Sequence, residues 1–118
     1  MIPVYNEVDI IKESLTHLIN QGIEPVVLDN GSTDGTYEIC QKLLEKGEIK
    51  LEQYVSNKFE WATTLRKLYD MALLEYPDWV IHSDADEFLE SYDNNVDLKN
   101  AILQVDSEGY NLIQFNVI

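Results

Sequence analysis

The 118-residue sequence is poor in basic residues, in cysteine and in long apolar runs. Its 8 lysines and arginines face 22 aspartates and glutamates, so the net charge of −14 argues against nucleic acid or an anionic membrane surface as a partner. The single cysteine, Cys40, excludes an intramolecular disulfide and favours a reducing compartment. No apolar run reaches the roughly 20 residues of a membrane helix, and no signal-peptide pattern begins the chain. We therefore expect a cytoplasmic location, with membrane association left open for a longer parent protein.

The residues that are present predict a folded chain. Hydrophobic residues make up 45% of the sequence and aromatic residues 10%, which is too much for a disordered protein. A chain of this length buries roughly two thirds of its unfolded surface, as one ordinary domain does. We predict a single domain over residues 1–118.

Short β-rich runs alternate with segments of helical periodicity, which is typical of a parallel sheet covered by helices. The pattern predicts strands at 2–5, 25–28, 49–55, 79–83 and 111–118. Helices are predicted from about 7 to 21, between the turn at 29–36 and Gly47, from 61 to the residue before Pro77, and at about 98–105. Asn6 is expected to cap the first helix and Gly22 to end it. The stripes that should face the core include Ile39, Leu43 and Leu44 in the second helix and Trp61, Leu65, Leu68, Ala72 and Leu73 in the third.

The expected fold is α/β, a three-layer αβα Rossmann-like arrangement whose parallel sheet has the strand order 3-2-1-4 followed by later strands. In this order the chain reverses direction between the first and fourth strands, and ligands bind outside the carboxyl ends of the strands at such a point. Three polar motifs end strands there: "YNE" at 5–7, "DNGS" at 29–32 and "DADEF" at 84–88. They should meet in one crevice, although none adjoins another in sequence.

The sequence "DADEF" has the chemistry of a site for a hard cation. Asp84 and Asp86 are separated by the small Ala85, so a tight exit from the strand can bring both carboxylates to one volume. Such ligands suit Mg²⁺ or Mn²⁺, which commonly take one or two carboxylates beside water and substrate phosphate. The same triplet also fits a solvated loop, but its place after a strand favours the metal. His82 is a weaker candidate ligand, because imidazole suits Zn²⁺ better.

The motif "DNGSTDGT" combines a turn with a helix start. Asn30-Gly31 is a turn dipeptide, and residues 32–34 are placed to cap the second helix. Asp29 directly follows the apolar run of its strand, so its carboxylate should face the crevice. There it could accept a hydrogen bond from a ring N–H of a base.

In this order and on these elements, "IPVYNE", "DNGSTDGT" and "DADEF" resemble the nucleotide-sugar-binding half of a family 2 glycosyltransferase with a GT-A fold. The resemblance covers almost the whole chain, and "DWVIHSDADEFL" is similar to a subgroup in which Glu-Phe follows the D-x-D motif. It implies metal-dependent transfer of a sugar from a nucleotide-diphosphate donor, commonly a uridine diphosphate sugar. The acceptor, whether a sugar, a lipid or a polysaccharide, is left open, as are the donor sugar and the anomeric outcome.

The resemblance also implies roles for individual residues. Asp29 would hold the base, Asp84 would approach the ribose or the metal, and Asp86 would bind the Mn²⁺ or Mg²⁺ that bridges the two phosphates. Further donor contacts are expected at the end of the first strand and on the third helix, from Pro3, Tyr5, Glu7 and Arg66. The chain departs from the family pattern at Asn30, where a second acid is common, and in "FEWATTLRKLYD", where small residues and an asparagine are common.

In the family, the acceptor-binding half and its general base follow this region, so the resemblance implies a truncated fragment that binds a donor but transfers sugar inefficiently. Glu87, Glu90 and Asp93 lie near enough in sequence to be considered as the base, with Glu87 a weak candidate. The last predicted strand would expose apolar side chains, which predicts dimerisation or aggregation. His17 is expected on a helix surface, and both tryptophans are expected to serve packing.

Two other classes of function fit part of the pattern. A non-catalytic nucleotide-binding or interaction module would keep the crevice without the transfer. A receiver-type signalling domain also gathers acids at strand ends, but here the acids follow the fourth strand and no matching lysine-bearing strand is present.

Overall fold

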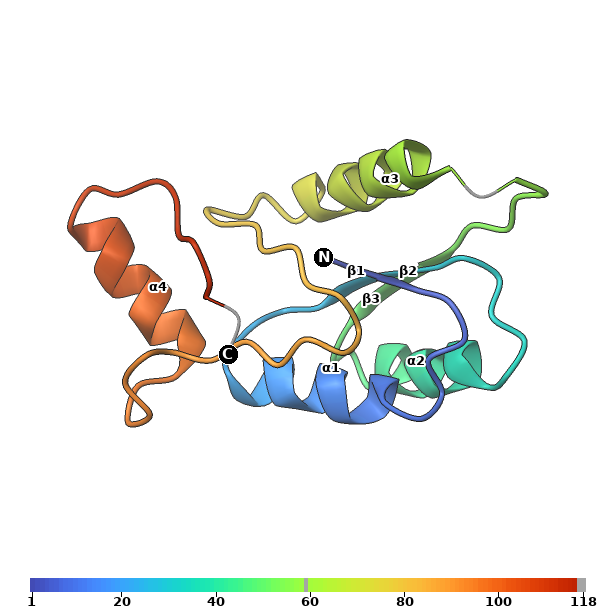
Figure 1. The fold of residues 1–118 in the computed structure, drawn as a ribbon, viewed down its shortest axis with the longest axis horizontal. Helices are drawn as coiled ribbons and strands as arrows, with labels where there is room; N and C mark the ends of the chain where they lie inside the picture. Colours follow the sequence, from blue (N-terminus) through green and yellow to red (C-terminus); the bar gives the residue numbers. More distant parts are fainter. Residues whose placement is uncertain (59, 117–118) are drawn as a thin grey trace.

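Three parallel strands form the centre of the structure, a computed structural model that describes residues 1–58 and 60–116. Strands β1 (Ile2–Val4), β2 (Val26–Asp29) and β3 (Lys50–Gln53) are hydrogen-bonded in the order β1-β2-β3. In the register, Val27 of β2 lies beside Ile2 on one side and beside Leu51 on the other. A helix joins each strand to the next, as a parallel sheet requires (Figure 1).

Helices α1 (Ile11–Asn20) and α2 (Thr36–Glu45) cover one face of this sheet. Their buried residues recur at helical spacing and form one core cluster with Ile2, Val4 and Val27 of the strands. The cluster takes from the helices Ile11, Leu15, Leu18, Cys40 and Leu43. The burial of this apolar stripe explains why the two segments are helical at these positions.

Helix α3 (Trp61–Leu73) covers the opposite face. Leu68, Met71 and Ala72 pack against Val26 and Leu28, which point away from the first cluster because successive strand residues alternate between faces. The predicted α/β class with helices on both sides of a parallel sheet is therefore confirmed.

Several boundaries and orientations differ from the sequence-based expectations. Helix α1 begins at Ile11 and not near Glu7, and Asn6 does not cap it, because its side chain bonds to the neighbouring loop. Leu44 and Leu73 are 39% and 44% exposed, since each lies one position, or about 100°, beyond a buried residue of its helix. Trp61 is 45% exposed in the first turn of α3 and is not a core residue.

The predicted fourth strand at 79–83 has no assigned strand in the structure. The segment nevertheless runs beside the start of β1, where the Met1 nitrogen donates to the Ile81 carbonyl at 2.6 Å and the Ser83 nitrogen donates to the Met1 carbonyl at 3.1 Å. These two bonds lie on either side of His82, as in a pair of parallel strands. Both are made by Met1 alone, however, and one residue is too short a ladder to form a strand. The full order 3-2-1-4 stays a prediction.

Helix α4 (Leu98–Ser107) stands at one end of the molecule (Figure 1). Asp97 caps it, accepting a hydrogen bond from the Asn100 nitrogen at 2.8 Å. Its first turn is fastened to the end of α1, because the Gln21 side-chain oxygen accepts from the Leu98 nitrogen at 2.8 Å. Its last turn is fastened by the Trp79 indole nitrogen, which donates to Asp106 at 3.0 Å.

The predicted strand at 111–118 is not formed at 111–116, where no neighbouring strand offers a ladder, and residues 117 and 118 lie outside the described residues. Leu112 in this segment is 81% exposed, and dimerisation through such side chains stays a prediction. Within residues 1–58 and 60–116, no helix combines the length and apolar character of a membrane span.

Candidate functional site

The loops that follow β1 and β2 are joined by hydrogen bonds at the carboxyl edge of the sheet. The backbone nitrogen of Asn6 donates to Ser32 Oγ at 3.0 Å, and the backbone nitrogen of Thr33 donates to Asn6 Oδ1 at 2.8 Å. Asn6 has a φ of 56°, a left-handed conformation that asparagine adopts more readily than most residues. The chain thereby leaves β1 with Tyr5, which is 56% exposed, at the surface of this edge.

Asp34 and Thr36 extend the same junction to the start of α2. Asp34 Oδ1 accepts from the Thr36 nitrogen at 3.0 Å and from Thr36 Oγ1 at 2.6 Å, while its Oδ2 accepts from the Val8 nitrogen at 3.1 Å. Thr36 Oγ1 in turn accepts from the Glu7 nitrogen at 2.8 Å. Desolvation works in the opposite direction, but these hydrogen bonds hold the pKa of Asp34 below its ordinary value. The prediction that residues 32–34 cap the second helix is wrong: Gly35 is the N-cap of α2, it makes no side-chain cap hydrogen bond to the described residues, and Asp34 instead bonds to Thr36, the first residue of the helix.

Asp29 is fully buried at the end of β2. Its Oδ1 accepts three hydrogen bonds, from the Gly31 nitrogen at 3.0 Å, the Ser32 nitrogen at 3.1 Å and Gln53 Nε2 at 3.0 Å. Its Oδ2 is also buried and has no hydrogen-bond partner in the described part of the chain. Oδ1 therefore shapes the turn at 29–32, whereas Oδ2 is a buried acceptor without a hydrogen bond, which costs stability.

The acidic motif after residue 83 forms a turn that is anchored by its smallest residue. Ala85 is buried in the same cluster as Ile2 and α1, whereas Asp84 and Asp86 on either side of it are exposed. The turn is closed by the Asp84 nitrogen, which donates to Glu87 Oε2 at 3.0 Å, and by the Glu87 nitrogen, which donates to the Asp84 carbonyl at 3.1 Å. An alanine at the centre fits the core and leaves both aspartates at the surface.

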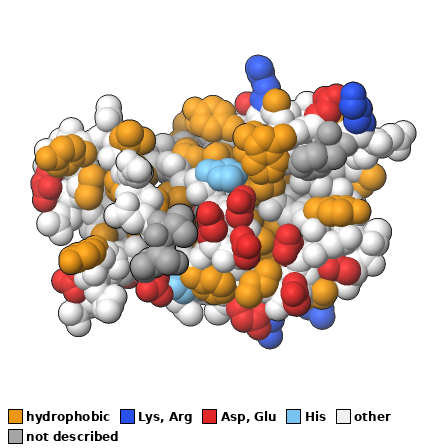
Figure 2. Space-filling view, in the orientation of Figure 1, with side chains coloured by type: hydrophobic (Ala, Val, Ile, Leu, Met, Phe, Trp, Pro, Cys, Tyr) orange, Lys and Arg blue, Asp and Glu red, His pale blue; other side chains and the backbone are white. Residues whose placement is uncertain are grey.

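Electrostatics shows that the acids of separate motifs come together. Desolvation, followed by the negative charges of Asp86, Asp9, Asp34 and Asp84, raises the pKa of Glu7 above its ordinary value. Charges of exposed groups are screened beyond short distances, so the contributions of Asp84 and Asp86 indicate that the motif after β1 lies near the acidic turn. Figure 2 shows acidic side chains gathered at the centre of one face, bordered by hydrophobic side chains and a histidine.

The structure does not bring all the predicted residues to this place. Pro3 lies in β1, at its edge position between two core residues, and is half-buried. Arg66 lies on the exposed outer face of α3, on the side opposite to Leu68, and forms no ion pair or hydrogen bond with the described residues. Glu87 is held in its own turn, and Asp93 accepts hydrogen bonds from Asn95 that lower its pKa. The roles predicted for these residues stay predictions.

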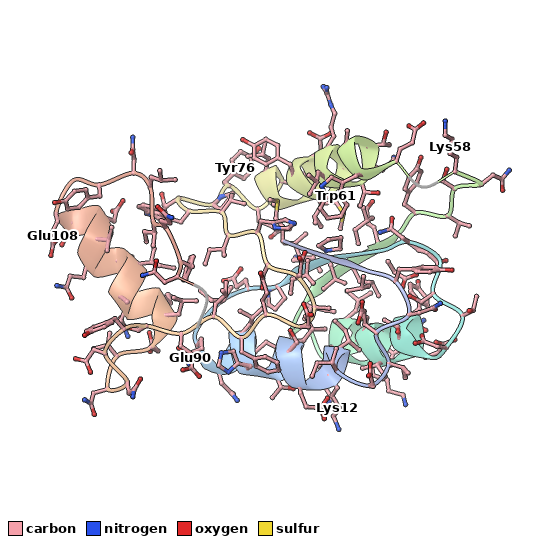
Figure 3. The ribbon with its side chains drawn as sticks, in the orientation of Figure 1. Lys12, Lys58, Trp61, Tyr76, Glu90 and Glu108 are labelled. Carbon is pink, nitrogen blue, oxygen red and sulfur yellow. The ribbon has the colours of Figure 1, made fainter. Side chains whose placement is uncertain are left out.

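An aromatic pair borders the acidic turn. Trp61 lies in the first turn of α3 (Figure 3) and meets the ring of His82 edge-on, with centroids 6.0 Å apart and planes at 89°. His82 is exposed and stands two residues before Asp84. Trp61 was expected to serve packing. Its position beside His82 depends on how α3 lies against residues 79–83, which the sequence does not show.

Within the described residues, no three side chains of the types His, Cys, Asp and Glu are arranged closely enough to hold a metal ion. The donor chemistry nevertheless fits a hard divalent cation, because the nearby acids provide carboxylate oxygens, and their charges, after desolvation, contribute to the raised pKa of Glu7. Two exposed carboxylates with water and phosphate oxygens can complete the coordination of Mg²⁺ or Mn²⁺.

The sequence profile described as Glycosyl transferase family 2 matches residues 1–114. The chain belongs to this family. Among solved structures, this family 2 chain is similar to the crystal structure of S. aureus TarS, with 29% identity and a TM-score of 0.64, over 90% of this chain and 19% of that one. It is also similar to the mannosyltransferase PcManGT from Pyrobaculum calidifontis in complex with GDP-Man and Mn²⁺, with 26% identity and a TM-score of 0.57, over 88% of this chain and 30% of that one. This family 2 chain thus spans less than a third of either relative, and no curated protein matches it.

These findings confirm the resemblance to family 2 glycosyltransferases, while the subgroup with Glu-Phe after the D-x-D motif stays a prediction. Asn6 belongs to the motif "YNE" expected at this crevice, but its predicted role as a helix cap is wrong, because its side chain joins the loops after β1 and β2. The available signal was an asparagine directly after a short strand, where a left-handed residue can redirect the chain.

Proposed function

We propose that the chain binds the donor of a glycosyl transfer, a nucleotide-diphosphate sugar, at the carboxyl edge of the sheet, with Mn²⁺ or Mg²⁺ held through Asp84 and Asp86. The observation that carries the proposal is the meeting of acids from separate strand ends around Glu7, whose pKa is raised first by desolvation and then by their charges. A divalent cation would relieve this repulsion and would allow an acidic protein to hold an anionic diphosphate. The family supports the reaction type, since its name describes glycosyl transfer.

Each residue of the edge has a distinct task in this proposal. Asp86 and Asp84 are exposed beside the buried Ala85 and present carboxylates to the cation. Tyr5 offers an exposed ring for stacking at the end of β1. Asp29 has one unmet buried oxygen that could accept an N–H of the base, if the turn at 29–32 opens enough to admit it. Pro3 and Arg66 are assigned no task here, because among the described residues neither is joined to this group by a hydrogen bond.

The chemistry follows from charge development in the reaction. Breaking the bond between sugar and phosphate builds negative charge on the leaving diphosphate, and a cation held by Asp84 and Asp86 would stabilise that charge as a Lewis acid. The protein's own part is to hold the donor so that the anomeric carbon faces an acceptor hydroxyl. A carboxylate base for that hydroxyl stays unassigned, and Glu87 would first have to release the Asp84 nitrogen that it binds at 3.0 Å.

The identity of the donor's nucleobase rests on a separate argument. The resemblance of the motifs implies uridine, whereas one similar structure is a mannosyltransferase in complex with GDP-Man and Mn²⁺. Both are nucleoside diphosphates joined to a sugar, so the shared chemistry is the diphosphate and the cation. We propose uridine diphosphate as the donor nucleotide, with guanosine diphosphate as the comparison.

Thermal unfolding with uridine or guanosine diphosphate, in Mn²⁺ or in excess chelator, tests the proposal. At about 100 times its dissociation constant, a ligand of the folded state should add about 2.7 kcal/mol of stability. The stabilisation should require Mn²⁺ and should be lost in Asp86→Asn. Asp70→Asn is the matched control, because it changes an exposed acid on α3 whose side chain makes no hydrogen bond to the described residues. Equal metal-dependent stabilisation in Asp86→Asn and wild type would refute the role of Asp86.

A further inference from the structure

His17 lies where α1 meets the chain that follows the acidic turn. Its Nε2 is 2.9 Å from the carbonyl oxygen of Leu89, and its ring meets Phe88 edge-on, with centroids 5.3 Å apart. A carbonyl oxygen only accepts hydrogen bonds, so Nε2 carries the hydrogen and donates it. The expectation that His17 is a plain surface residue is therefore wrong, because it makes a half-buried contact across 72 residues of sequence.

Few other bonds hold the chain after the acidic turn. The turn closes mainly on itself, through Asp84 and Glu87. For residues 87–96, all of them described, the hydrogen bond from His17 is the only one that reaches another helix or strand. Figure 3 shows Glu90, the next residue after this bond, beside the end of α1.

The neighbouring contacts show why the hydrogen bond from His17 to Leu89 affects the conformation of the candidate site. The start of the turn is fixed, because Ala85 is held in the core and the nitrogen of the buried Ser83 donates to the Met1 carbonyl at 3.1 Å. The bond at Leu89, four residues later, supplies the second fixed point. Between these two points lie Asp86, Glu87 and Phe88, so the conformation of this segment, and with it the place of the Asp86 carboxylate, depends on both.

We infer that His17 is a positioning residue, which orients the segment 86–90 at the edge of the donor site by donating from Nε2 to Leu89. This inference rests on the proposed function, because it assigns to the segment a part in binding the cation and the donor. It adds a residue from the far end of α1 to a site that is otherwise built at strand ends. A misplacement of about 1 Å in such a segment can cost up to about a hundredfold in function.

The test compares His17→Gln with His17→Asn in the 118-residue chain. The glutamine amide nitrogen sits at the same distance along the side chain as Nε2 and can still donate, whereas the asparagine amide corresponds to Nδ1 and falls short. Hydrogen exchange of the backbone amides at 85–92, measured without metal or nucleotide, reports the order of the segment. Isothermal titration with uridine diphosphate in Mn²⁺ reports the site, and exchange at Val26–Asp29 in the core reports the global fold.

His17→Asn should speed exchange at 85–92 by about threefold to tenfold and weaken Mn²⁺-dependent nucleotide binding by a similar factor, as expected for one lost hydrogen bond. His17→Gln should resemble wild type in both measurements, and exchange in the core should not change in either variant. Unchanged exchange at 85–92 in His17→Asn would overturn the inference. Faster exchange with unchanged binding would also overturn it, because the segment would then be ordered without positioning anything. If wild type binds no nucleotide with Mn²⁺, the proposed function fails, and the exchange data alone still decide whether His17 orders the segment.

Discussion

The amide oxygen of Asn6 accepts a hydrogen bond from the backbone nitrogen of Thr33 at 2.8 Å, which ties the exit of β1 to the exit of β2. A second bond, from the Asn6 nitrogen to Ser32 Oγ at 3.0 Å, makes the tie reciprocal. Because Asn6 stands between Tyr5 and Glu7, this tie sets where both residues emerge from the sheet. A left-handed asparagine thus organises the loops of the candidate donor site.

Substitution of Asn6 should separate the two roles of this residue. Asn6→Gly keeps the left-handed backbone and loses the bond to Thr33, so the free energy of unfolding should fall by about 1 kcal/mol. Asn6→Ala loses the same bond and also strains a φ of 56°, so its loss should be larger by about 1–2 kcal/mol. Urea unfolding of both variants measures the difference. Equal losses would show that the backbone conformation carries no strain.

The cluster around Glu7 predicts a pH dependence of stability. The folded-state pKa of Glu7 is raised, so the folded chain holds this proton more tightly than the unfolded chain does. Below the unfolded value of 4.5, Glu7 is protonated in both states and does not lower the stability of the folded chain. The loss of stability develops as the pH rises from there through the raised folded-state pKa, where the folded chain must also ionise Glu7. Glu7→Gln should therefore be more stable than wild type at neutral pH, and the difference should disappear in acid. Urea unfolding at pH 4 and pH 7 measures the difference in stability between Glu7→Gln and wild type. If that difference persists at pH 4, it does not come from ionisation of Glu7.

Ala85 should tolerate no larger residue. It is 5% exposed in the core cluster beside two exposed aspartates, so Ala85→Val forces extra volume into packed surroundings and should cost about 1–3 kcal/mol of unfolding free energy. The turn should also shift, which would weaken Mn²⁺ binding measured by titration. Ala62→Val on the exposed side of α3 is the control and should change neither quantity by much. Normal metal binding in a destabilised Ala85→Val would separate packing from site geometry.

Two substitutions of Asp29 should distinguish its turn-forming oxygen from its unmet oxygen. Asp29→Ala removes the acceptor of three hydrogen bonds and should cost about 1–3 kcal/mol of stability. Asp29→Asn can keep those bonds through its single oxygen while it changes the unmet position to a donor. Asp29→Asn should therefore fold nearly as wild type but bind uridine diphosphate about tenfold or more weakly, with little change for inorganic diphosphate in Mn²⁺. Titrations that show the same loss for both ligands would assign Asp29 to the fold.

Cys40 should be inert in the folded chain. Burial, with a further contribution from the charge of Asp29, raises the pKa of its thiol from 9.0 to about 12, so almost no thiolate exists at pH 8. A thiol-specific reagent should react slowly in buffer and rapidly above the unfolding midpoint in urea. Rapid labelling without urea would mean that α2 opens locally far more often than its core packing suggests.

The strands and helices of the sheet region could be predicted from the sequence, because each depends on short-range patterns. Apolar residues at helical spacing place Ile11, Leu15 and Leu18 on one side of α1 whatever else the chain does. The glycine at 22 takes a φ of 75° and ends that helix, as the sequence indicated. The sequence also located the acidic triplet, because closely spaced carboxylates suit a hard cation, but its role as a metal site stays a prediction.

The tertiary structure alone decided the contacts between residues that are distant in sequence. Nothing local to Asn6 indicates that its side chain turns toward Thr33, and nothing in the helix pattern of α1 shows that His17 reaches Leu89. A strand also needs a partner along its length, so the β-rich residues at 79–83 remain unassigned where only Met1 reaches them. Local sequence determines which conformations a segment prefers, whereas hydrogen bonds and packing between segments depend on where the whole chain places each partner.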